Sequence, residues 1–251
     1  MGIRSRLRSR SGDYSGGSPP AFVPTDISGI QAWFDASDAA TITQAAGLVS
    51  QWNDKSGNLY HATQGVALNQ PLTGARTING RNVIKFDGVA STMGVNSGLY
   101  GISNGNNTLF VVFAKDSAVD ALARPFTGNN ATFRYGVYAD TALSGIGFIN
   151  CVNSSQPTDP WTSDTNPLCF AGTRSGTSLS AYVGGGTPTT NANGTSTSVT
   201  ALNIGGGVAG FAFLNGVVAE IIAYNSALSS TDMNRVGNYL AAKWGITWTN
   251  V

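Results

Sequence analysis

The sequence predicts an all-β domain, an antiparallel β-sandwich with one helix at its C-terminal end and an extended N-terminal arm. Three observations predict this fold class. Charged residues are only 11% of the chain, so Ser, Thr, Asn and Gly must cover a surface that Glu and Lys normally cover in helical proteins. The 32 glycines suit a chain with many tight turns. Short apolar or alternating segments recur at a spacing typical of sandwiches.

The strands are expected where these segments lie. A first strand is plausible at residues 30–35, and the alternation of apolar and polar residues at 49–52 and 83–86 indicates half-buried strands. The continuous apolar run at 109–114 predicts a central strand that is covered on both faces. Further strands are expected at residues 133–138, 145–151, 168–173, 178–183, 201–204 and 217–224.

One helix is predicted at residues 230–244. Ser229 or Ser230 can cap its start, and Gly245 suits the left-handed conformation that ends many helices. Four large apolar residues recur at helical spacing: Met233, Val236, Leu240 and Trp244. We expect this face to pack on the sandwich.

Residues 1–25 form the arm, and residues 26–251 form the sandwich with its helix. The arm is rich in Arg, Ser, Gly and Pro and cannot bury a core by itself. Four arginines recur at every second position, on one side of an extended chain: Arg4, Arg6, Arg8 and Arg10. Two interpretations stay open: a solvated tail, or a docking arm that orders against an acidic partner.

The charge balance and the chain start bear on partners and localisation. With the four arm arginines set aside, 10 of the 14 Lys and Arg remain against 13 acids, so we expect no nucleic-acid binding by the folded body. No apolar stretch follows the basic start, so no secretory signal is predicted. No run approaches the roughly 18 apolar residues of a membrane helix, so no membrane insertion is expected.

Several segments carry a recognisable pattern: AWFDASD at 32–38, QWNDKSGN at 51–58, HATQ at 61–64, VIKFDG at 83–88, FLNGVVAEIIAYN at 213–225 and LAAKWG at 240–245. The chain resembles, over about residues 30–247, the laminin-G/concanavalin A-like jelly-roll domains, in their bacterial and phage branch. This resemblance implies a jelly-roll sandwich. It leaves the function open, because that group includes lectins, adhesion modules, glycanases and viral surface proteins.

The resemblance also allows a test for catalysis. Glycanases of this group resemble one another in a strand with clustered acids, Glu-x-Asp-x-x-Glu or close to it, and Glu220 is the only glutamate here. Asp35 and Asp38 are three residues apart and are not expected to share a strand face. His61, the only histidine, is expected to be structural, and the glycine runs at 184–186 and 205–207 are expected to be turns. We therefore expect no enzymatic activity.

Two kinds of binding site remain candidates. Related domains often hold a calcium ion at the rim, and Asp54, Ser56 and Asn58 offer oxygen ligands in one turn; a self-capped turn is the alternative, and no other cofactor is expected. For glycans, loop aromatics matter most: Trp161 is the best candidate, followed by Tyr100 and Tyr138. The two cysteines, Cys151 and Cys169, are either buried thiols or a disulfide.

The function expected from the sequence is a non-enzymatic phage virion protein, such as a capsid decoration, head-fibre, neck or tail-appendage subunit. The arm would bind other virion proteins, and the lectin-like sandwich would be displayed on the virion surface, where it could adhere to host glycans. A homo-oligomer is expected. The alternative is a cellular carbohydrate-binding lectin or adhesin module.

Overall fold

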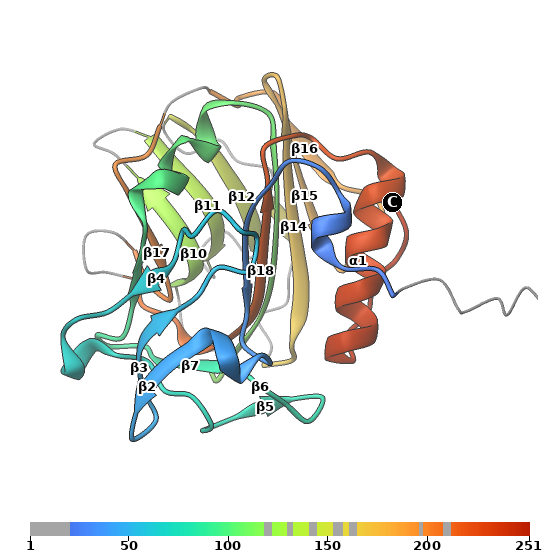
Figure 1. Ribbon diagram of the computed structural model, residues 1–251. Helices are drawn as coiled ribbons and strands as arrows, with labels where there is room; N and C mark the ends of the chain where they lie inside the picture. Colours follow the sequence, from blue (N-terminus) through green and yellow to red (C-terminus); the bar gives the residue numbers. More distant parts are fainter. Residues whose placement is uncertain are drawn as a thin grey trace, which may run out of the picture.

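The computed structural model describes residues 21–117, 122–129, 133–140, 145–152, 158–160, 165–195, 198–207 and 212–251. In this part of the chain two antiparallel sheets pack face to face, and one helix covers the outer face of one of them (Figure 1). The predicted fold class, an all-β sandwich with a C-terminal helix, is confirmed.

The helix-covered sheet has seven strands. In spatial order they are β1 (Ile30–Asp35), β18 (Asn215–Tyr224), β9 (Asn107–Lys115), β14 (Leu168–Ser175), β15 (Ser178–Val183) and β16 (Thr189–Asn191), with β7 (Ile84–Asp87) also paired to β18. The strand order differs from the chain order, so the chain crosses repeatedly between the two layers, as in jelly-roll sandwiches.

The second sheet has nine strands. In spatial order they are β13 (Thr158–Pro160), β12 (Gly145–Val152), β11 (Phe133–Asp140), β10 (Leu122–Asn129), β17 (Ala201–Ile204), β8 (Met93–Val95), β4 (Ala62–Thr63), β3 (Leu48–Trp52) and β2 (Ile42–Ala45). A separate hairpin joins β5 (Thr77–Ile78) to β6 (Arg81–Asn82), and four 3-10 helices, η1 to η4, connect the strands: Pro24–Asp26, Ala39–Thr41, Ala67–Asn69 and Ser97–Asn104.

Strand β9 explains why one apolar run serves two cores. Leu109, Val111 and Phe113 point into the core between the sheets, whereas Phe110 and Val112 point toward the helix. Because both faces of this strand are buried, every position of its centre must be apolar. The prediction of a central strand covered on both sides is confirmed.

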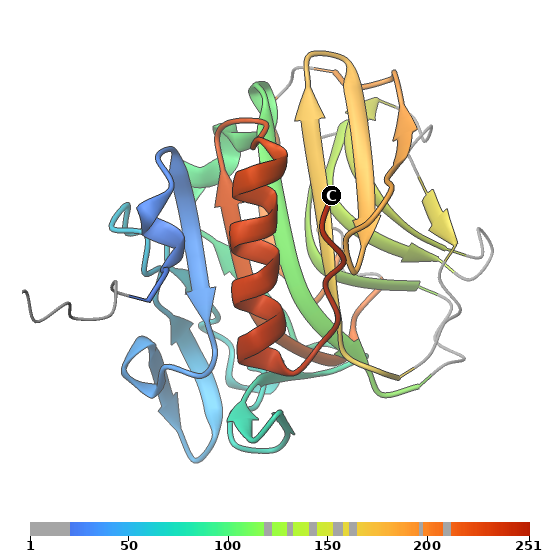
Figure 2. The same ribbon diagram turned by 90° about the vertical axis from the view of Figure 1, so that its right-hand side faces the viewer.

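Helix α1 (Ser230–Trp244) lies along the outer face of the seven-stranded sheet, as Figure 2 shows. The hydroxyl of Ser229 caps its start by accepting a hydrogen bond from the Asp232 amide, and Gly245 ends it in the left-handed conformation, with φ of 66°. All four residues of the predicted apolar face are buried on the sheet. The helix prediction is therefore confirmed at both ends and on the packed face.

The structure also contains elements that the pattern did not predict. Strand β10 was missed because Arg124, Pro125 and Gly128 interrupt any apolar alternation. Residues near the end of the expected arm contact the folded body, since Pro24 is buried and its carbonyl accepts a hydrogen bond from the Tyr224 hydroxyl at 2.9 Å. No helix among the described residues is long and apolar enough to cross a membrane.

Candidate functional site

The only glutamate of the chain is fully buried between β18 and α1. The carboxylate of Glu220 accepts hydrogen bonds from the indole of Trp33 at 2.7 Å, the indole of Trp244 at 2.7 Å and the hydroxyl of Tyr239 at 2.9 Å. The ammonium of Lys243 completes the set at 2.8 Å. All four partners act as donors toward Glu220, so together they suit an ionised carboxylate, which only accepts.

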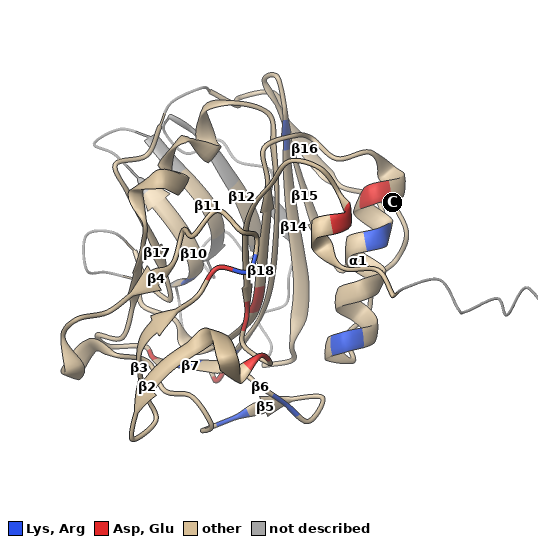
Figure 3. Cartoon of the chain, in the orientation of Figure 1, with Lys and Arg blue, Asp and Glu red and all other residues tan. Residues whose placement is uncertain are grey.

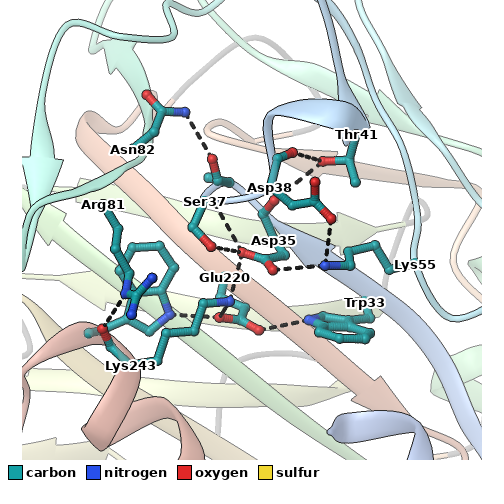
Figure 4. A network of polar contacts seen from close by, with 12 residues as sticks. Trp33, Asp35, Ser37, Asp38, Thr41, Lys55, Arg81, Asn82, Glu220 and Lys243 are labelled. Carbon is teal, nitrogen blue, oxygen red and sulfur yellow. Dashed lines mark hydrogen bonds and ion pairs between the residues drawn. The ribbon is translucent and has the colours of Figure 1, made fainter.

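A second carboxylate lies beside Glu220. Asp35 on β1 stands directly opposite Glu220 in the strand register, and the Nζ atom of Lys243 bridges them, at 2.7 Å from Asp35 and 2.8 Å from Glu220 (Figure 4). The ammonium of Lys55 binds the other oxygen of Asp35 at 3.0 Å and Asp38 at 2.8 Å. These residues form one network, which we call the Glu220 network.

The sequence did not predict this arrangement. It predicted only that Asp35 and Asp38 do not share a strand face, and Asp38 lies beyond the end of β1. The strand end turns so that both aspartates reach Lys55, and sheet pairing brings Glu220 next to Asp35. The pattern missed this because Glu220 and Asp35 are 185 positions apart and meet only through strand pairing.

Burial and charge set the protonation of these groups. Burial alone would raise the pKa of Asp35, but hydrogen bonds from Lys243 and Ser37 and the charge of Lys243 outweigh it and hold the pKa below its usual value. Burial raises the pKa of Glu220, although Lys243 opposes this change. Burial and the negative charge of Glu220 raise the pKa of Tyr239, so its phenol is held in the neutral form.

Above the Glu220 network, a groove of about 680 Å³ runs along α1. Six residues form most of its walls: Phe22, Ser37, Arg81, Arg235, Asn238 and Tyr239. The rings of Phe22 and Tyr239 meet edge to face, with centroids 5.9 Å apart. Figure 3 shows Lys and Arg on α1 and at the β5–β6 hairpin, which lies near the C-terminal end of the helix. The groove thus combines aromatic surface with hydrogen-bonding groups, which is the usual chemistry of small-ligand sites.

Of the predicted glycan contacts, the structure describes only the side chain of Tyr100, and that side chain does not line this groove. Trp161 lies outside the described residues. Tyr138 is on β11, but the structure does not describe its side chain. Tyr100, on η4, is partly buried and packs against the core between the sheets.

The arginines Arg4, Arg6, Arg8 and Arg10 of the arm lie outside the described residues as well. The groove was not predicted because its walls come from segments that are distant in the sequence and meet only in the fold. The only sequence signal for it is the helical spacing of Arg235, Tyr239 and Lys243, which places them on one face of α1.

The turn proposed for calcium is held by its own hydrogen bonds. The Asp54 carboxylate accepts from the amides of Trp33, Ser56 and Tyr60 and from the Ser56 hydroxyl, at 2.7–3.1 Å. Asn58 donates to the carbonyls of residues 30 and 31. These contacts favour the self-capped turn over a calcium site. In the described part of the chain no group of three or more His, Cys, Asp or Glu could hold a metal.

Two other predicted residues have structural surroundings. His61 accepts a hydrogen bond from the Asp54 amide at 3.1 Å, which agrees with its expected structural role. Cys169 is a free thiol that is fully buried beneath α1, where burial and the charge of Glu220 raise its pKa. Cys151 lies on β12 in the other sheet, and its side chain is outside the described residues. A buried thiol, one of the two interpretations, therefore holds for Cys169.

No protein-family model and no curated protein matches this chain. Among solved structures, Trypanosoma rangeli sialidase in complex with sialic acid superposes with a TM-score of 0.61 and 17% identity, over 86% of this chain and 33% of the sialidase. A second match is domain 4 of AbnA, a GH43 extracellular arabinanase from Geobacillus stearothermophilus, in complex with arabinotriose. It superposes with a TM-score of 0.60 and 12% identity, over 83% of this chain and 98% of the arabinanase domain.

The binding domain of botulinum neurotoxin DC in complex with SialylT gives a TM-score of 0.53 and 10% identity, over 87% of this chain and 52% of that one. The chain spans about a third of the sialidase and nearly all of the arabinanase domain. At these identities the likenesses concern the fold: this chain has the β-sandwich architecture of these proteins.

Proposed function

We propose that this chain is a non-catalytic carbohydrate-binding domain and that its ligand lies in the groove along α1. The observation that carries the proposal is the composition of the groove walls. The rings of Phe22 and Tyr239 offer flat surface to a sugar ring, and the side chains of Asn238 and Ser37 offer hydrogen bonds to hydroxyl groups. The Glu220 network beneath keeps the walls rigid, which lowers the entropy that binding would cost.

The state of the carboxylates supports a binding role over hydrolysis. A glycosidase needs two carboxyl groups that face the sugar, one of them able to give a proton. Asp35 is nearly inaccessible and bound by two lysines, and Glu220 is fully buried among four donors. Tyr239 has a raised pKa, which is the opposite of what an activated nucleophile needs.

The solved structures add weight to this proposal. Two of them, the arabinanase domain and the toxin binding domain, are sandwiches of the same architecture that were captured with an oligosaccharide or SialylT. Because a shared fold does not determine a shared site, the groove must be tested on this chain.

A glycan array with neutral and acidic oligosaccharides tests the proposal. Binding should be found and should fall at least tenfold in Phe22→Ala, which removes one aromatic wall. Leu68→Ala, a change at an 89% exposed residue outside the groove, should bind normally. The absence of any hit would contradict the function, and a hit that survives Phe22→Ala but disappears in Trp161→Ala would move the site to the loop that the sequence favoured.

We further propose, from the sequence alone, that the domain is carried on a virion and attached through its N-terminal arm. Each exposed ion pair between an arm arginine and an acidic group of the partner contributes only about 0–1 kcal/mol to the binding free energy. Firm attachment therefore needs several arms that act together in an oligomer. Deletion of residues 1–20 keeps Phe22 and Pro24, which contact the folded body, and should abolish incorporation into particles without unfolding the sandwich. Particles that still incorporate the shortened chain would contradict this attachment. The alternative hypothesis, a cellular lectin or adhesin module, would then be favoured.

A further inference from the structure

The groove along α1 has an uneven charge. Arg235, Tyr239 and Lys243 share one helix face, and Arg81 of β6 joins them at the C-terminal end of the helix. Arg235 and Lys243 are eight residues apart, which corresponds to about 12 Å along a helix. Cationic side chains therefore stand at both ends of a groove with aromatic walls between them.

These cations differ in how far they are already neutralised. Lys243 is bound between Asp35 and Glu220 and has little charge to offer a ligand. Arg235 pairs with Asp232 at 3.0 Å, and its guanidinium lies 4.8 Å from the Phe22 ring centroid.

Arg81 is the least engaged of the three. Its Nε donates to the carbonyl of Lys243 at 2.9 Å, which fixes the guanidinium at the groove. Within the described part of the chain, its two Nη atoms have no hydrogen bond or ion pair. The carbonyl of Lys243 also accepts from the side chain of Asn79 at 3.1 Å, so the helix end does not depend on Arg81 alone.

We propose that the groove selects glycans that carry carboxylates, with the two Nη atoms of Arg81 as the main contact. The proposal rests on the carbohydrate-binding function above and names its ligand class. A guanidinium with a fixed position and two unused donors matches the two oxygens of a carboxylate. Uronic acid chains and terminal sialic acids share this group. A chain of uronic acids could also place a second carboxylate near Arg235.

The test compares two forms of one oligosaccharide. Tetragalacturonate and its fully methyl-esterified form have the same backbone but differ in charge. By calorimetry in 50 mM salt, the acid form should bind about tenfold more tightly, the size expected for one charge-assisted contact. The preference should shrink in 500 mM salt, because exposed charges are then screened.

Variants locate the preference. Arg81→Gln should abolish the preference, so that the acid form and the methyl ester bind equally. Arg81→Lys should restore part of the preference, since lysine keeps the positive charge but lacks the paired donors of the guanidinium. The matched control is Arg76→Gln, which removes the same charge from the same hairpin region but at a residue that pairs with Asp116 outside the groove. This control should keep the full preference.

The outcomes separate the two proposals. Equal binding of both forms would overturn the acidic preference and leave the carbohydrate-binding function intact, whereas no binding of either form, together with an empty glycan array, would overturn both. An equal loss in Arg76→Gln and Arg81→Gln would show a general charge effect and also contradict the site. A parallel comparison of sialyllactose with lactose distinguishes a terminal acid from a uronic acid chain.

Discussion

At the scale of single residues, one glutamate organises the contact between the helix and the sheet. Glu220 is fully buried and accepts from four donors, so the free energy of burying its carboxylate depends on every one of them. A buried carboxylate without partners would be strongly unfavourable, and a buried donor without Glu220 would be unfavourable too. The Glu220 network therefore acts as a unit that fixes α1 at one position on the sheet.

This leads to a prediction for Glu220→Gln. Glutamine has nearly the same shape as glutamate. However, its amide NH2 group is a donor and would point at other donors in the place of a carboxylate oxygen that now accepts their hydrogen bonds. Lys243 would also lose one of its two carboxylate partners. We expect the free energy of unfolding to fall by about 3–5 kcal/mol, as when one partner of a buried pair is removed. Tyr239→Phe, which removes only the hydroxyl donor to Glu220, should cost about 1 kcal/mol. Urea unfolding measures both, and equal costs would contradict the unit described here.

A second residue predicts how stability depends on pH. One oxygen of Asp87 accepts from the amides of Val89, Ala90 and Ser91 and from the Ser91 hydroxyl. Burial would raise its pKa, but these hydrogen bonds outweigh burial and lower the pKa to about 2.

Because the pKa of Asp87 is lower in the folded state, its contribution to stability is complete above about pH 4 and is lost as the pH falls toward 2. The expected result is that wild type loses more stability than Asp87→Asn over this range, since asparagine keeps an acceptor oxygen but does not titrate. Parallel stability curves for the two proteins in urea would contradict the assignment.

At the scale of elements, the middle of α1 packs against the C-terminal tail. Gly237 faces the indole of Trp248, and a methyl group at position 237 would overlap that ring. The indole in turn packs on Phe110 of β9, with centroids 5.8 Å apart. The glycine is thus needed for the close approach of tail and helix, not for backbone freedom.

Gly237→Ala should therefore be destabilising, although Gly to Ala in a helix interior normally stabilises by up to about 1 kcal/mol. Thermal unfolding should show a lower Tm. In a Trp248→Ala background the overlap is absent, so the same change should become neutral or stabilising. A lower Tm of similar size in both backgrounds would mean that the Trp248 contact is not the cause.

Elements also show what the sequence could predict. The helix was predicted with both ends because cap residues and a four-residue apolar face are local signals. The apolar run of β9 was equally clear. Strand β10 was not predicted, since Arg124 and Pro125 break its alternation of apolar and polar residues. Strands β4, β5 and β6 were not predicted either, because two residues are too few to show an alternation.

At the scale of the whole molecule, the candidate site depends on pairings that no local pattern contains. The groove joins Phe22 at the start of the fold, Arg81 of a hairpin and α1 at the end of the chain. Sequence reasoning instead favoured single loop aromatics such as Trp161, because an aromatic in a polar loop is visible without knowing the fold. Composition, together with the spacing of short apolar segments, did predict the fold class, since sparse charge and many glycines reflect the whole surface.

The central claim is that the groove along α1 is the place where this domain binds its ligand. Backbone amide shifts recorded by NMR during titration with tetragalacturonate test it most directly. We expect the affected amides to be those of residues 22, 79–81 and 235–243. Shifts confined to the segments around Tyr100 and Trp161 would contradict the claim, as would the absence of shifts with every oligosaccharide that the glycan array identifies.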